Sequence, residues 1–305
     1  MYQNPHKQQG AAIIVALFVV SIVAISAVLM LERFSKDLRS TELIHTASNA
    51  ELLAAGSVAW AMEQLNENWK KQKPGQIVDA TPITSPENTM DNATISSTIE
   101  AADGNFNINN IANPEYEENF IRLIQIVQPE MTEEKAKNIS TAVKNWIATG
   151  SGNLDEYYSK QNPPYREAHR AMTNISELRL VKGVTREIYM ALFPYIFALP
   201  EITVMNVNNA PLPVLMSLSP SMTKASAETI RKSTPFQDVA KFMELDVVKN
   251  NNISKEKIGI ISNYFLVKTR VKVNDHETVL FTLIHREIKD KKPIETVLWQ
   301  SKGLQ

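Results

Sequence analysis

The sequence has no cysteine, few glycines and almost no net charge, and each shortage excludes a class of function. The absence of Cys from 305 residues excludes disulfides, thiolate metal sites and Cys nucleophiles. The nine Gly form neither a GxGxxG nor a GxxxxGK(S/T) string, which removes the common phosphate-binding loops. A net charge of -1 removes the simplest case for nucleic-acid binding, which is a strongly basic protein. A hydrophobic content of 44% is still ample for a core, and the length suggests about two domains.

One segment carries no charge at all, the 21 residues from Ala11 to Leu31. As a helix rising about 1.5 Å per residue it would extend roughly 32 Å, enough to cross the hydrocarbon core of a bilayer. Its polar members are Ser21 and Ser26, whose hydroxyls can bond back to the preceding turn. We therefore predict one transmembrane helix over residues 11–31.

Ten polar residues precede this segment, and three interpretations of them stay open. The segment can remain as an uncleaved signal anchor. A secretory signal peptide cut near Ala24-Ile25-Ser26 is the second, although five apolar residues follow that site. The third is a leader, residues 1–10, cut between Gly10 and Ala11 so that the whole hydrophobic helix begins the mature chain. The counts of Lys and Arg on either side of the segment mildly favour a cytoplasmic location for the residues that follow it.

Beyond the span, an apolar stripe continues in steps of three and four residues, as on one face of a helix. It comprises Leu52, Ala55, Ala59, Met62, Leu65 and Trp69. Because no proline lies between Pro5 and Pro74, we predict a continuous helix over residues 11–70. We expect the stripe to pack against partner helices, beneath the chain's own sheet, or against both at different levels.

The remainder of the chain divides by its periodicity into three parts. Residues 71–110 combine a proline-rich linker with strands, and Asp103-Gly104 predicts a hairpin joining Ala93–Ile99 to Phe106–Ile108. Residues 111–261 have helical spacing, including a helix that Thr132 can cap. Residues 262–305 alternate like strands. We predict an α+β fold in which a long N-terminal helix packs on a small antiparallel sheet, with a large all-α insertion between strands.

The sequence offers little catalytic chemistry. The five His residues show no HxH or HExxH spacing, so no metal site is predicted from them. Ser221-Met222-Thr223-Lys224 matches the SxxK pattern of some serine acylases, but no KTG or SDN string accompanies it. We therefore predict no enzyme, and an anchored serine hydrolase that uses Ser221 stays as an alternative.

Residues 205–239 are similar to a helix-hairpin-helix (SAM-like) pattern. Asn209 stands where a capping Thr is usual, and Asn can also cap a helix. A DNA-binding hairpin needs a Gly-x-Gly turn whose N–H groups approach a phosphate, but this turn is Ser219-Pro220-Ser221-Met222, and Pro220 has no N–H. We predict a packing role without nucleic acid; the competing hypothesis is a membrane-anchored DNA-binding protein of the competence type.

Several motifs in this order resemble a known family, the K-type minor pseudopilins of bacterial type II secretion. The resemblance spans nearly the whole chain. Its segments are Gln9-Gly10-Ala11-Ala12-Ile13-Ile14-Val15, Asp103-Gly104-Asn105-Phe106-Asn107-Ile108-Asn109, Tyr157-Tyr158, Tyr165-Arg166, Ser176-Glu177-Leu178-Arg179-Leu180-Val181-Lys182-Gly183, Tyr195, Ala198-Leu199-Pro200 and Asn206-Val207-Asn208.

The resemblance implies a processing route and a set of partners. Prepilin peptidase would remove the leader after Gly10, and Ala11 would then be N-methylated. The chain would be a single-pass protein of the bacterial inner membrane with a periplasmic body, an orientation that overrides the weak charge count. It would join the I, J and H types of minor pseudopilin at the pseudopilus tip, meet the inner-membrane secretion platform and help to initiate assembly.

Val15 stands where most pilin-like subunits carry Glu. A buried carboxylate there can pair with a neighbour's terminal amine and is costly when unpaired. The resemblance associates its loss with a tip subunit, although valine also simply suits lipid.

Some K-type proteins bind calcium through acidic residues around an Asp-Trp-Ile-Asp segment and a Gly-x-Glu-Asp segment. Here Asn145, Ala148 and Leu154 replace three of those carboxylates, while calcium takes six to eight oxygen ligands. We therefore expect no cofactor and no calcium site of that kind, with Asp155 and Glu156 left for a different one.

Overall fold

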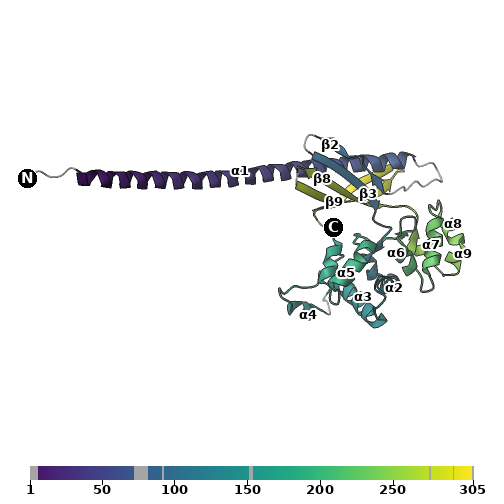
Figure 1. The fold of residues 1–305 in the computed structure, drawn as a ribbon. Helices are drawn as coiled ribbons and strands as arrows, with labels where there is room; N and C mark the ends of the chain where they lie inside the picture. Colours follow the sequence, from purple (N-terminus) through teal and green to yellow (C-terminus); the bar gives the residue numbers. More distant parts are fainter. Residues whose placement is uncertain are drawn as a thin grey trace, which may run out of the picture.

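The computed structural model describes residues 6–71, 82–90, 93–150, 154–274, 276–290 and 292–303. Its dominant feature is a single helix, α1 (His6–Lys71), whose first half projects away from the body of the molecule (Figure 1). The chain contains no proline between Pro5 and Pro74, so nothing in this stretch removes a backbone hydrogen bond. The predicted continuous helix over residues 11–70 is confirmed.

The second half of α1 packs on an antiparallel sheet with the strand order β1-β3-β8-β9-β10, and β2 pairs with β3. The strands are β1 (Ile83–Thr84), β2 (Asn88–Met90), β3 (Ala93–Ala101), β8 (Tyr264–Val273), β9 (His276–Lys289) and β10 (Lys292–Lys302). Strands β8, β9 and β10 form a meander. Strand β3 lies beside β8 although more than half of the chain separates them, so the predicted α+β fold is confirmed.

The chain leaves this sheet after β3 and returns at β8, and the intervening segment is mostly helical (Figure 1). Its α-helices are α2 (Glu117–Val127), α3 (Glu133–Ile147), α4 (Asp155–Ser159), α5 (Arg186–Leu192), α6 (Leu212–Ser217), α7 (Lys224–Lys232), α8 (Val239–Glu244) and α9 (Asp246–Lys249). Its 3-10 turns are η1 (Ile108–Ala112), η2 (Pro114–Tyr116), η3 (Ile175–Leu180), η4 (Phe193–Tyr195) and η5 (Lys255–Lys257). Thr132 caps α3 as predicted, accepting the N–H of Lys135.

The insertion is not purely helical. Two short parallel pairs join distant segments, β4 (Phe106–Asn107) with β5 (Ile196–Phe197) and β6 (Met205–Asn206) with β7 (Ile258–Gly259). The predicted hairpin is therefore wrong, because β4 pairs with β5 rather than turning back on β3. Two features prevent β4 from pairing with β3. The side chain of Asn107 accepts the N–H of Asn109, so the chain turns into η1 directly after β4. Strand β3 is also already paired with other strands on both of its edges.

The sheet is covered on both faces. Phe265 and Ile284 pack against α1, whereas Leu266 and Leu283 pack on the opposite face against Phe197 of the insertion. Buried residues therefore run without alternation from Leu280 to Ile284 in β9. The insertion has its own hydrophobic core, so the body consists of α1, the sheet and the insertion in successive layers.

Candidate functional site

The first half of α1 carries a long apolar segment that is exposed. Its large side chains from Ile13 to Leu31 are all exposed, and Val15 is 62% exposed. By length and composition this helix can cross a membrane, and no part of the body covers its apolar window. Gly10 and Ala11 fall within α1, and cleavage and methylation there stay predictions.

The predicted stripe on the second half of α1 divides between two faces. Leu52 is 73% exposed and Ala55 and Ala59 are also exposed, whereas Leu65 is buried against the sheet. Met62 and Trp69 lie half-buried between them. The stripe therefore lies only partly beneath the sheet, and the residues of α1 that are buried there are mostly small: Ala50, Ala54, Val58, Ala61 and Leu65. Packing against partners stays a prediction for the exposed residues.

Arg286 fixes the end of α1 to the sheet. Its side chain is only 2% exposed, and its Nη2 donates to the carbonyl of Leu65 in α1 at 2.9 Å. Its Nε lies 3.4 Å from Oε1 of Glu295 on β10, and its guanidinium stacks over Phe265 and Trp69 at 4.6 and 5.7 Å from the ring centroids. Sequence patterns missed this residue, since one Arg in a strand carries no distinguishing signal.

The two asparagine-rich motifs of the sequence meet where the insertion joins the sheet. The N–H of Asn206 donates to the Asp103 carbonyl at 2.9 Å, and the N–H of Asn263 donates to the Asp103 carboxylate at 2.8 Å. A Cβ at Gly104 would lie 2.7 Å from the Asn209 carbonyl oxygen, so glycine is required by close approach of backbone. Asp103 thereby ties both ends of the insertion to its middle.

Asn209 does not cap a helix as predicted. Helix α6 begins after Pro211, with no side-chain cap. Asn208 instead joins loops, since its Nδ2 donates to the carbonyls of Phe236 and Ile260 and its Oδ1 accepts the Phe236 N–H. In these loops the asparagine side chains form hydrogen bonds with backbone groups that no helix or strand pairs. Their role is therefore to hold the loops of the insertion together.

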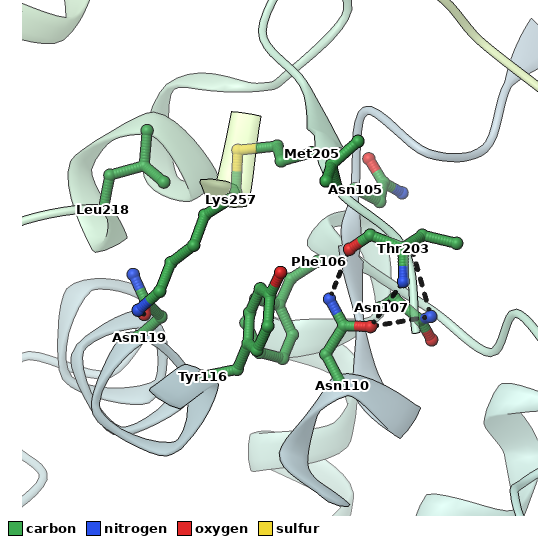
Figure 2. A pocket seen from close by; sticks show the side chains of 11 residues that line it. Asn105, Phe106, Asn107, Asn110, Tyr116, Asn119, Thr203, Met205, Leu218 and Lys257 are labelled. Atoms are coloured by element: carbon green, nitrogen blue, oxygen red, sulfur yellow. Dashed lines mark hydrogen bonds between the residues drawn. The ribbon is translucent and has the colours of Figure 1, made fainter. Parts of the chain in front are cut away.

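A small cleft lies at the base of the insertion (Figure 2). Lys257 reaches across it from η5, donates to Oδ1 of Asn119 at 3.2 Å and lies 5.2 Å from the centre of the Tyr116 ring. Burial lowers the pKa of Lys257. On the other side, the amide of Asn110 donates to the Thr203 carbonyl and accepts its N–H. These polar groups satisfy one another, so we interpret the cleft as a packed joint.

The hairpin formed by α6 and α7 has neither a phosphate-binding turn nor an activated serine. Helices α6 and α7 are joined by the predicted Ser219–Met222 turn, in which Pro220 has no N–H to donate. Ser221 and Lys224 are both exposed, and in the described part of the chain Ser221 bonds to Ser219 rather than to Lys224. The geometry therefore favours neither DNA binding nor acyl transfer.

The segment that corresponds to the calcium motif follows the end of α3. Asn145 and Ala148 lie at that end and Leu154 precedes α4, so none of the three adds a carboxylate. Glu167 and His169, which no sequence motif marks, lie beside Asp155 there. Burial raises the pKa of Glu167.

Known proteins resemble this chain in sequence and in structure. A family model described as type II secretion system (T2SS), protein K, matches residues 104–201. The type II secretion system protein K of Pectobacterium carotovorum subsp. carotovorum is 26% identical, with 92% of this chain and 93% of that protein aligned. Its counterpart in Pseudomonas aeruginosa is 28% identical, over 92% and 89%.

The crystal structure of the GspK-GspI-GspJ complex from enterotoxigenic Escherichia coli matches with a TM-score of 0.74 at 22% identity. The match covers 87% of this chain and 99% of the matched chain. The resemblance to type II secretion protein K is confirmed. The long helix, sheet and helical insertion are thus arranged as in the matched chain of that complex.

Proposed function

We propose that this chain is a non-enzymatic minor pseudopilin that assembles at the tip of the type II secretion pseudopilus and helps to initiate its assembly. The observation that carries the proposal is α1 itself. Residues 12–31 are apolar and exposed, the second half of the helix is fixed to the sheet, and the helix runs between them without a break. Such a helix can rest in a bilayer and then enter a helical assembly.

Processing by prepilin peptidase between Gly10 and Ala11 would precede assembly, followed by N-methylation of Ala11. The mature chain would rest as a single-pass protein in the inner membrane beside the secretion platform, with its body in the periplasm. Intact-mass measurement of the chain extracted from bacterial membranes should give the mass of residues 11–305 plus one methyl group. An amino terminus at Met1 or near Ala27 would contradict this route.

Two observations support the tip position. Val15 provides no carboxylate to pair with the terminal amine of a neighbouring subunit, and an unpaired carboxylate in lipid would be costly. The insertion adds a second layer of helices beyond the sheet, bulk that would obstruct stacking of a further subunit (Figure 1). Both features suit a subunit that ends a filament.

The matched structure is a complex of K, I and J proteins, which supports I-type and J-type minor pseudopilins as partners. We place their contact on the exposed face of α1 at Leu52, Ala55 and Ala59, because small side chains let helices approach closely. An Arg at such a position would put a charge into a helix–helix contact, where it is costly to bury.

The variant Ala55→Arg/Ala59→Arg should therefore reduce co-purification with tagged I and J subunits at least tenfold in detergent. Ala225→Arg is the matched control, because Ala225 is exposed on α7 in the insertion, and it should leave the yield unchanged. Retention of both partners by the double variant would move the interface elsewhere. Failure of the unmodified chain to retain either partner would contradict the proposed function.

A further inference from the structure

Three side chains at the distal side of the insertion converge on one point. Asp155 begins α4, and Glu167 and His169 come from the extended segment that follows this helix. One ligand atom from each, two carboxylate oxygens and an imidazole nitrogen, all lie within 4.8 Å of one another. The cluster stands on a packed aromatic group, in which Trp146 meets Tyr158 and Tyr165 with ring centroids 5.4 and 6.3 Å apart.

Glu167 is the feature that demands an explanation. Glu167 is only 5% exposed, and neither carboxylate oxygen accepts a hydrogen bond of normal geometry from the described residues. The Leu154 N–H comes close enough to lower the pKa of the carboxyl group but does not offset the effect of burial, which raises it. A buried carboxylate without a partner is strongly unfavourable. The nearest ionisable groups are the carboxylate of Asp155, which adds like charge, and the imidazole of His169. A bound cation would supply positive charge between the two carboxylates.

His169 is oriented as a metal ligand is. Its Nδ1 lies 3.3 Å from the carbonyl of Ala148, and because a carbonyl only accepts, this nitrogen carries the proton. Its Nε2 faces the cluster, 3.6 Å from Oδ1 of Asp155. A backbone carbonyl that fixes the imidazole tautomer in this way is the usual support behind a metal-binding His.

The backbone holds the imidazole in this position. His169 adopts a left-handed conformation with φ 50°, and its N–H donates to the Trp146 carbonyl at 3.0 Å. Asp155 is tied to the same segment, because its Oδ1 accepts the N–H of Glu167 at 3.3 Å. The three ligands thus come from two segments that are already fixed to each other and to the end of α3.

The geometry points to a divalent transition-metal site formed by Asp155, Glu167 and His169, of the class that zinc represents. One nitrogen and two carboxylate oxygens match zinc chemistry, in which ligand bonds of about 2.0–2.2 Å place donor atoms roughly 3.4 Å apart. A small closure of the cluster would satisfy that spacing, and water can take the fourth position.

This site differs from the calcium arrangement of the family in donors and in ion. Of the acidic positions in the two calcium-motif segments, this chain keeps Asp155 and has Asn145, Ala148 and Leu154 at three others. Calcium needs six to eight oxygen ligands and has little use for imidazole. A bound ion would join α4 to the end of α3, which is useful in a chain without cysteine.

The test uses the full-length chain in detergent, stripped with EDTA and titrated with zinc chloride or calcium chloride by calorimetry. We expect one zinc per chain, bound at least tenfold more tightly than calcium. Glu167→Gln and His169→Asn should each weaken zinc about tenfold or more, by analogy with the loss of supporting ligands in other metal sites. Cobalt should give the visible absorption of a tetrahedral ion, lost in His169→Asn.

Two matched variants serve as controls. Glu156→Gln alters an exposed carboxylate that pairs with Lys160 next to the site, and His276→Asn alters an exposed imidazole at the start of β9; neither should change zinc affinity. Asn tolerates φ near 50°, so His169→Asn should fold, which its metal-free melting temperature would check. No zinc binding, affinity unchanged in Glu167→Gln or His169→Asn, or tighter binding of calcium would overturn the proposal.

Discussion

Arg286→Met should lower the free energy of unfolding by about 3–5 kcal/mol, since removal of one partner from a buried ion pair leaves the other uncompensated. The remaining charge would be Glu295, which is largely buried on β10. The same change removes the hydrogen bond to the Leu65 carbonyl, which fixes the end of α1 to the sheet. Urea unfolding followed by tryptophan fluorescence would measure the loss, with Trp69 reporting directly because it lies under the guanidinium.

The matched control is Arg270→Met, which breaks the ion pair with Glu277 at the surface of the same sheet. Exposed pairs contribute only about 0–1 kcal/mol, so this variant should remain close to the parent. The double variant Arg286→Met/Glu295→Leu should recover much of the loss, because it removes both buried charges together. Equal losses in the two Arg variants would mean that Arg286 is not the residue that fixes α1.

Phe120→Ala should destabilise the insertion by about 3–5 kcal/mol, the usual cost of deleting a buried phenyl ring. Phe120 is fully buried on α2 and stacks on Phe106 of β4 with ring centroids 5.6 Å apart. The cavity would therefore open where α2 meets the first segment of the insertion. Thermal unfolding and hydrogen exchange of the purified chain would give the size and the location of the effect.

Met190→Ala is the control, because Met190 is exposed on α5 and alanine keeps the helix favourable. It should change stability by less than about 0.5 kcal/mol. Since the insertion has its own core, faster exchange in Phe120→Ala should be concentrated in α2 and α3 while β8 and β9 stay protected. Uniform loosening of sheet and insertion would instead show that they unfold as one unit.

Patterns that extend along a single helix or strand predicted that element correctly. The charge-free run and the absence of proline predicted α1, and the return of alternation after residue 262 predicted the strands of the meander. Thr132 correctly marked the start of α3, because a capping side chain acts within one turn. These predictions succeeded because each depends on the local backbone or on periodicity within a single element.

The wrong predictions share a different cause. The stripe on α1 omitted most of the residues that pack on the sheet, because Ala50, Ala54 and Ala61 are only weakly apolar in any sequence pattern. The hairpin was wrong because the partner of β4 is β5, ninety residues further along the chain. In both cases the deciding contact was long-range.

The candidate sites follow the same division. The sequence by itself determined an apolar helix long enough to cross a membrane, the absence of a Gly-x-Gly turn, and non-acidic residues at 145, 148 and 154, since each depends on residue type at a position. Only the tertiary structure brought Arg286 beneath α1 and Glu167 and His169 beside Asp155. The physical reason is that burial and convergence belong to the folded chain: a Glu or an Arg carries no sign in sequence of whether water or a neighbouring side chain will surround it.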